Sequence, residues 1–143
     1  MNYIDLLNYF IKLTNIKIGH LATYLNYDIS YISKWIHGKR RPSRNNIIEI
    51  NNKLAKIFAQ HIIEKNLLDT VINDLDFSLV TSGNETLIFA SLEKNIYDYL
   101  NLSYDNKLKL EKKSTHKEIN YIIGQTEIEN SLVEIFRYIF TND

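Results

Sequence analysis

Apolar residues recur every three or four positions through most of the chain, which is the spacing of an α-helix. Polar and charged residues fill the positions between them, so each predicted helix has one face for a core and one for solvent. The first three segments with this pattern predict helices over about Tyr3–Leu13, Ile18–Leu25 and Ile29–Ile36, with Asp28 as N-cap of the third.

Helical spacing continues in the second half of the chain. A long fourth helix, with Ser43 as a candidate cap, is predicted to run to about Lys65, because no Gly or Pro interrupts it. A short helix over Leu68–Leu75 and a loop over Thr81–Thr86 follow. Later apolar residues at helical spacing are Leu87, Ile88, Leu92, Ile96, Tyr99 and Leu100, and the stretch Glu127–Phe140 is again amphipathic. The chain is therefore predicted to be all-α, with a boundary near residues 66–82 that separates residues 1–68 from residues 69–143.

The second and third predicted helices are joined by only three residues. Such a tight turn needs a small residue where the helices cross, a left-handed residue in the turn, and apolar residues that face inward on both helices. Ala22 supplies the small residue, and Asn26 tolerates positive φ better than most residues other than Gly. The inward positions are Leu21, Leu25, Ile32 and Trp35. This order of residues indicates a helix-turn-helix.

A basic run follows the third helix directly. Gly38 stands where a helix C-terminus needs a left-handed residue, and Pro42 restricts the exit of the chain. The basic residues are Lys39, Arg40, Arg41 and Arg44, and no acid occurs between Asp28 and Glu49. The run is therefore predicted to contact a polyanion, although a solvated loop is the alternative.

The segment HLATYLNYDISYISKWIHGKRRPS resembles the Xre or Cro/cI-type (lambda-repressor-like) helix-turn-helix family. The matching positions are Leu21, Ala22, Leu25, Asn26, Tyr27, Ile32, Trp35, Gly38, Lys39 and Pro42. Asn26 replaces the usual turn Gly, Ile18 stands where Gln is frequent, and Ile29 stands at a position that is often polar. The resemblance covers residues 1 to about 58–68. It implies a helix-turn-helix bundle, followed by a mainly helical region over residues 69–143.

The resemblance also implies that the third helix, about residues 29–37, lies in the major groove of double-stranded DNA. If Ile32 and Trp35 point inward, helical geometry turns the side chains expected to face bases outward: Ile29, Ser30, Ser33, Lys34 and His37. The residues expected to contact phosphates are Tyr31, Lys39, Arg40, Arg41 and Arg44. Lys34 would donate to guanine, and Ile29 would pack on a thymine methyl group.

Charge is distributed unevenly although the formal net charge is zero. Ten basic and four acidic residues up to Leu68 give 10 − 4 = +6, and seven basic and thirteen acidic residues from Asp69 give 7 − 13 = −6. The basic half suits DNA, and the acidic half is expected to build a homodimer. The alternative role for residues 69–143 is a sensor for a peptide or protein effector, and a third possibility is that the chain is an N-terminal fragment of a longer regulator. The whole chain is read as a sequence-specific transcriptional regulator; the alternative is an interaction or antitoxin-type module that binds a protein.

Other classes of function find little support in the sequence. Cys is absent, so neither a disulfide framework nor a thiolate metal site is expected. The pairs His61–Glu64 and His116–Glu118 lack an evident third metal ligand. Motifs for nucleophilic catalysis, phosphate-cradling loops and paired carboxylates are missing, so we expect neither an enzyme nor a cofactor or metal. The apolar runs are too short for a membrane span and the N-terminus does not resemble a signal peptide, which makes the cytoplasm the expected location.

Overall fold

The structure, a computed structural model, describes residues 1–80 and 83–110. All regular structure in these residues is helical: α1 (Tyr3–Thr14), α2 (Ile18–Leu25), α3 (Ile29–Ile36), α4 (Ile47–Glu64), α5 (Leu68–Leu75) and α6 (Glu85–Tyr104). The all-α class is therefore confirmed for this part of the chain. The amphipathic stretch Glu127–Phe140 and the pair His116–Glu118 lie outside the described residues.

The short helices end where single residues turn the backbone. Helices α2, α3 and α5 have the bounds that the sequence predicts, and α1 extends one residue further, to Thr14. Asn15 and Asp76 adopt left-handed backbone angles directly after α1 and α5, with φ of 58° and 59°. In each case the left-handed residue donates its N–H to a carbonyl of the last helical turn, which satisfies a group that the helix end leaves open.

Helix α4 begins later than the sequence predicts, and Ser43 is not its N-cap. Residues 44–46 form a turn, and the Asn46 N–H donates to the Ser43 carbonyl at 3.1 Å. The first helical residue is Ile47. The loop before α4 lies against the end of α6, where the Tyr104 hydroxyl donates to the Pro42 carbonyl at 2.6 Å and Arg44 pairs with Asp105.

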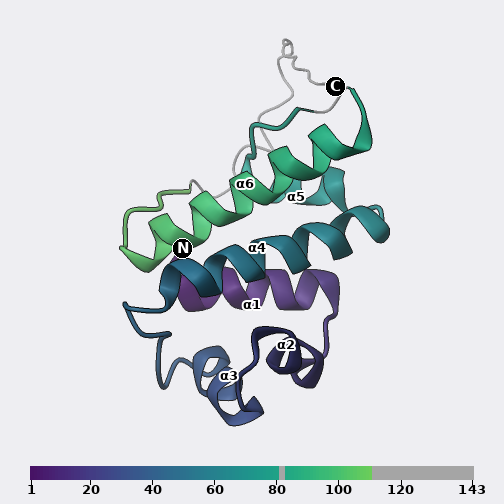
Figure 1. The fold of residues 1–143 in the computed structure, drawn as a ribbon. Helices are drawn as coiled ribbons and strands as arrows, with labels where there is room; N and C mark the ends of the chain where they lie inside the picture. Colours follow the sequence, from purple (N-terminus) through teal and green to yellow (C-terminus); the bar gives the residue numbers. More distant parts are fainter. Residues whose placement is uncertain (81–82, 111–143) are drawn as a thin grey trace. The chain divides into compact units, whose positions relative to one another are not determined.

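Helix α4 is the central element of the compact unit Met1–Lys109. Figure 1 shows it running between α6 on one side and the α2–α3 pair on the other, with α1 packed beside it. Phe58 of α4 stacks on Phe10 of α1, with ring centroids 5.1 Å apart. Because α4 meets neighbours on more than one side, half of its 18 residues are buried, including Leu54, Ala55 and Ile62.

A buried polar network joins three helices. The Tyr3 hydroxyl of α1 donates to Asn51 of α4 at 2.8 Å, and the Asn51 amide nitrogen donates to Asn101 of α6 at 2.7 Å. Burial raises the pKa of Tyr3, which keeps its hydroxyl a donor. Asn51 is fully buried, so both of its bonds replace bonds to water. This network makes α6 part of the body that holds α1 and α4.

The compact unit Met1–Lys109 includes α6, so it continues past the boundary expected near residues 66–82. The apolar residues Leu92, Ile96 and Leu100 are buried, as their spacing predicts, whereas Leu87 is 53% exposed near the start of the helix. Tyr99 is half-buried and donates its hydroxyl to the Leu75 carbonyl at 2.8 Å. The first part of the acidic half therefore packs against the basic half.

Candidate functional site

The turn between α2 and α3 has the geometry that its residues predict. Asn26 is left-handed, with a φ of 63°. The Tyr27 N–H donates to the Ala22 carbonyl at 3.0 Å, and the Asn26 N–H donates to the Thr23 carbonyl at 3.2 Å. This bonding closes the end of α2 and sends the chain directly into α3.

Helix α3 is fixed to the body by one face. Ile32 is fully buried, and the indole of Trp35 is only 3% exposed. Trp35 also contacts the Tyr27 ring edge to face, with centroids 5.4 Å apart. At the helix end the Asn8 amide of α1 donates to the Ile36 carbonyl at 2.9 Å. The core role expected for Ile32 and Trp35 is therefore confirmed.

The opposite face of α3 carries the side chains that the sequence predicts as base contacts. Ile29 is 51% exposed, and Ser30, Lys34 and His37 are also exposed, while Ser33 is half-buried. The backbone thus brings all five residues to one outward surface. We call these five side chains, together with Tyr31, the α3 face.

Three of the polar side chains on the α3 face, those of Ser30, Ser33 and His37, already have local partners, and the Ser33 hydroxyl lies 3.3 Å from His37 Nδ1. The Ser30 hydroxyl donates to the Asp28 carboxylate at 3.2 Å, so Asp28 sits at the N-cap position without accepting a backbone N–H. His37 Nδ1 lies 2.8 Å from the Ser33 carbonyl oxygen. By contrast, Lys34 has no side-chain partner among residues 1–80 and 83–110. Lys34 is therefore the residue of this face with the most freedom to bond to a ligand.

The loop after α3, residues 37–46, starts with a tight helix end. Gly38 has a φ of 74°, which a side chain would strain. Its N–H donates to the Trp35 carbonyl at 3.1 Å, and the Lys39 N–H donates to the Lys34 carbonyl at 2.9 Å. This pair of bonds is the Schellman arrangement. It turns the chain so that Lys39 and Arg40 follow the α3 face closely.

The four cations of this loop divide into two pairs. Lys39 and Arg40 are exposed, and their side chains have no partner in the described part of the chain. Arg41 and Arg44 instead reach the C-terminal end of α6. Arg41 donates to the Tyr104 carbonyl, and Arg44 pairs with the Asp105 carboxylate at 2.9 Å. Within the described residues, therefore, Lys39 and Arg40 are the two cations of this loop whose side chains have no partner.

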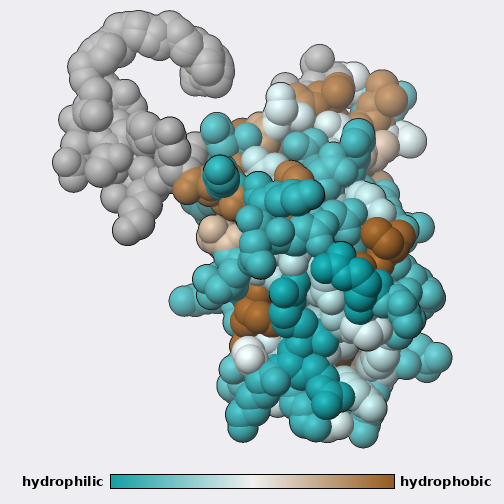
Figure 2. Space-filling model, turned by 90° about the vertical axis from the view of Figure 1, so that its left-hand side faces the viewer, coloured by the Kyte–Doolittle hydropathy of each residue, from teal (hydrophilic) through white to brown (hydrophobic). Residues whose placement is uncertain are grey.

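The role of Tyr104 and Asp105 was not anticipated from the sequence. They lie about sixty residues beyond the arginines that they contact, and no local spacing links the two segments. Figure 2 faces the side where the end of α6 and the loop after α3 meet. It shows a largely hydrophilic surface with separate apolar spots.

A groove of about 400 Å³ lies beside α3. Its lining residues are Tyr27, Tyr31, Trp35, Arg40, Arg41, Pro42, Ser43 and Asn46. The lining combines three aromatic rings with guanidinium, hydroxyl and amide groups. Such a lining can hold an anionic group against a flat apolar surface.

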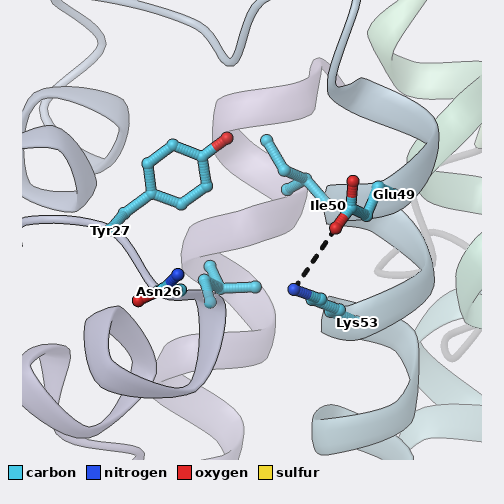
Figure 3. Close-up of a pocket in the computed structure, with 6 residues that line it drawn as sticks. Asn26, Tyr27, Glu49, Ile50 and Lys53 are labelled. Carbon is cyan, nitrogen blue, oxygen red and sulfur yellow. Dashed lines mark ion pairs between the residues drawn. The ribbon is translucent and has the colours of Figure 1, made fainter.

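A second hollow, about 270 Å³, separates the α2–α3 turn from α4. Figure 3 shows Tyr27 and Ile50 pointing toward each other across it. Lys53 closes the α4 side through an ion pair with Glu49 at 3.4 Å. The Glu49 carboxylate in this hollow is therefore already paired with Lys53, one helical turn further along α4, and is not a free acid.

Two histidines meet where α2 packs near α4. The rings of His20 and His61 have centroids 6.2 Å apart, and the buried Nδ1 of His61 has no hydrogen-bond partner in the described residues. Burial lowers the pKa of His61, and the Lys65 ammonium and His20 lower it further, against the opposing effect of Glu64. Within the described residues, no three His, Asp or Glu side chains gather to hold a metal ion.

His61 is expected to make stability depend on pH. Its pKa in the folded chain lies below the unfolded value of 6.5, so the unfolded chain binds the proton more readily. The free energy of unfolding should therefore fall as the pH drops below about 6.5. Urea unfolding at several values between about pH 7 and pH 5 would measure this. His61→Gln should flatten the dependence, and a slope equal to that of the wild type in this variant would contradict the assignment.

No family model matches the chain, and comparisons with curated proteins and with solved structures also find no match. None of the described helices combines the length and apolarity needed to cross a membrane.

Proposed function

We propose that the chain is a lambda-repressor-like, sequence-specific DNA-binding regulator of transcription that acts in the cytoplasm. The α3 face would lie in the major groove of double-stranded DNA. One observation carries the proposal. Helix α3 is anchored through Ile32 and Trp35, and it turns five outward side chains toward solvent. The loop directly after it carries Lys39 and Arg40, which have no side-chain partner within residues 1–80 and 83–110.

The roles within the site follow from geometry and chemistry. Lys34, whose ammonium is unoccupied, would read guanine O6 or N7, and Ile29 would contact a thymine methyl group. Lys39 and Arg40 would neutralise phosphates beside the groove, which gives affinity and register. Tyr31 and Ser43, which line the groove beside α3, would be further hydrogen-bond donors to the DNA phosphates.

The dimer belongs to the same proposal. Helix-turn-helix proteins commonly bind two half-sites about one DNA turn apart, which requires two copies of the domain. A homodimer of this chain, built with part of residues 69–143, would supply them. If the chain binds as a homodimer, the bound DNA sequence should contain two related half-sites, which an experiment can detect.

Selection of bound sequences from a random duplex library tests the proposal. The wild-type chain should enrich a motif with two related half-sites. Lys34→Ala should still bind, but with relaxed preference at one or two positions in each half-site, because a bidentate base contact is worth about 1–3 kcal/mol of discrimination. Lys56→Ala, at an exposed lysine on α4, serves as the control and should select the wild-type motif. Failure of the wild-type chain to enrich any sequence would contradict the proposal.

A protein-binding module of the antitoxin type is the second candidate. Two large apolar side chains of the α3 face, Ile29 and Tyr31, are 51% and 43% exposed, and they would suit a protein partner. Such a module should co-purify with a partner that protects Lys39 and Arg40 from lysine- and arginine-directed modification. DNA, in contrast, would protect these residues only at low salt.

A further inference from the structure

The end of α6 contacts the loop after α3 through the side chain of Tyr104. Tyr104 is buried, its ring lies edge to face with Tyr3 at 5.4 Å, and its hydroxyl donates to the Pro42 carbonyl at 2.6 Å. The Arg41 guanidinium lies 3.9 Å from the ring centroid, and that of Arg44 lies 5.0 Å from it. Both arginines are therefore oriented by Tyr104.

The two arginines differ in how firmly they are held. Arg41 combines the closer ring contact with a hydrogen bond to the Tyr104 carbonyl, so its position is tied to the backbone of α6. Arg44 is held by the Asp105 carboxylate, in a pair whose side chains are 71% and 40% exposed. An exposed ion pair of this kind contributes little to stability, and water and salt compete with it. Arg44 can therefore exchange its partner, whereas Arg41 serves the loop structure.

A phosphate oxygen can replace a carboxylate oxygen on a guanidinium, because arginine binds both by the same charge-assisted hydrogen bonds. Asp105 occupies Arg44 in this way and places a negative charge beside a loop that has no acid of its own. We propose that Asp105 is an intramolecular competitor of DNA phosphate for Arg44, and that it sets the affinity of the loop for DNA. This inference rests on the proposed function.

Binding of the full chain to a random-sequence duplex of about 30 base pairs, measured at several salt concentrations, tests the competition. Asp105→Asn removes the charge but keeps the shape of the residue after α6. It should bind DNA about threefold more tightly near 50 mM salt, and the slope of log K against log salt should steepen by about 0.9, the value for one more phosphate contact.

Asp98→Asn is the matched control. Asp98 lies on α6, is 46% exposed and pairs with Lys94 at 3.0 Å. Its substitution therefore makes the same change in net charge as Asp105→Asn, but away from the loop after α3. Its salt slope should equal that of the wild type. In an Arg44→Gln background, Asp105→Asn should no longer steepen the slope, which separates competition for Arg44 from a general loss of acidity.

Two outcomes would overturn the inference. If the wild type binds DNA and Asp105→Asn leaves the affinity and slope unchanged, or steepens the slope equally without Arg44, Asp105 does not compete, while the proposed function stands. If the wild-type chain shows no salt-dependent binding to duplex DNA at about 50 mM salt, the proposed function and this inference fail together.

Discussion

A chain carrying Trp35→Ala is expected to lose about 3–5 kcal/mol of its free energy of unfolding. The indole is only 3% exposed, and it packs against Tyr27 at 5.4 Å, so truncation would leave a cavity between α3 and the turn before it. Small domains have only about 5–15 kcal/mol in total, so this loss would unfold a large share of molecules under mild denaturation. Urea unfolding followed by far-ultraviolet circular dichroism measures the change.

Tyr31→Ala provides the comparison on the same helix. Tyr31 is 43% exposed and its ring lies 6.0 Å from that of Tyr27, so the loss should stay below about 1 kcal/mol. A Trp35→Ala chain that unfolds at the same urea concentration as Tyr31→Ala would show that the indole does not anchor α3.

Replacing Lys39 and Arg40 together with alanine is expected to have the largest effect on DNA affinity. Both side chains are exposed and unoccupied in the described residues, so they are the cations most available to phosphates. Loss of two phosphate contacts should reduce the salt slope by about 1.8 and weaken binding about tenfold near 50 mM salt. Arg41 is left intact because its contacts with Tyr104 hold the loop in place.

The control for this variant is Lys12→Ala with Lys56→Ala. These lysines are exposed on α1 and α4, and their removal changes the net charge by the same amount. The control should bind DNA with nearly the wild-type slope, and both variants should unfold at the wild-type urea concentration. Equal losses of DNA affinity in the two variants would mean that total charge, and not the position of the loop, governs binding.

Local chemistry made much of the fold predictable from the sequence. Helices α2 and α3 have their predicted bounds because Asn26 and Gly38 supply left-handed turns directly after them. The buried face of α3 followed from the spacing of Ile32 and Trp35. These features depend on residues a few positions apart, and steric limits on the backbone leave few alternatives.

Contacts between distant segments were not predictable. Ser43 is not an N-cap, because α4 starts only at Ile47, and the loop before it is held at the end of α6 through the bond from the Tyr104 hydroxyl to the Pro42 carbonyl. Nothing near Tyr104 in the sequence indicates that it orients two arginines. The pair Lys39 and Arg40 differs from the pair Arg41 and Arg44 because the fold places Tyr104 and Asp105 beside the second pair. The sequence therefore indicated which residues are basic, whereas the structure distinguishes which of them are occupied.

The most direct test of the central proposal is a titration of the isotopically labelled chain with duplex DNA carrying the selected motif, followed by amide chemical shifts. The proposal predicts that the largest changes fall on residues 29–37 and on Lys39 and Arg40, with smaller changes along α5 and the first turns of α6. The proposal would be contradicted if saturating DNA left the signals of residues 29–40 unchanged, or shifted α5 more than α3.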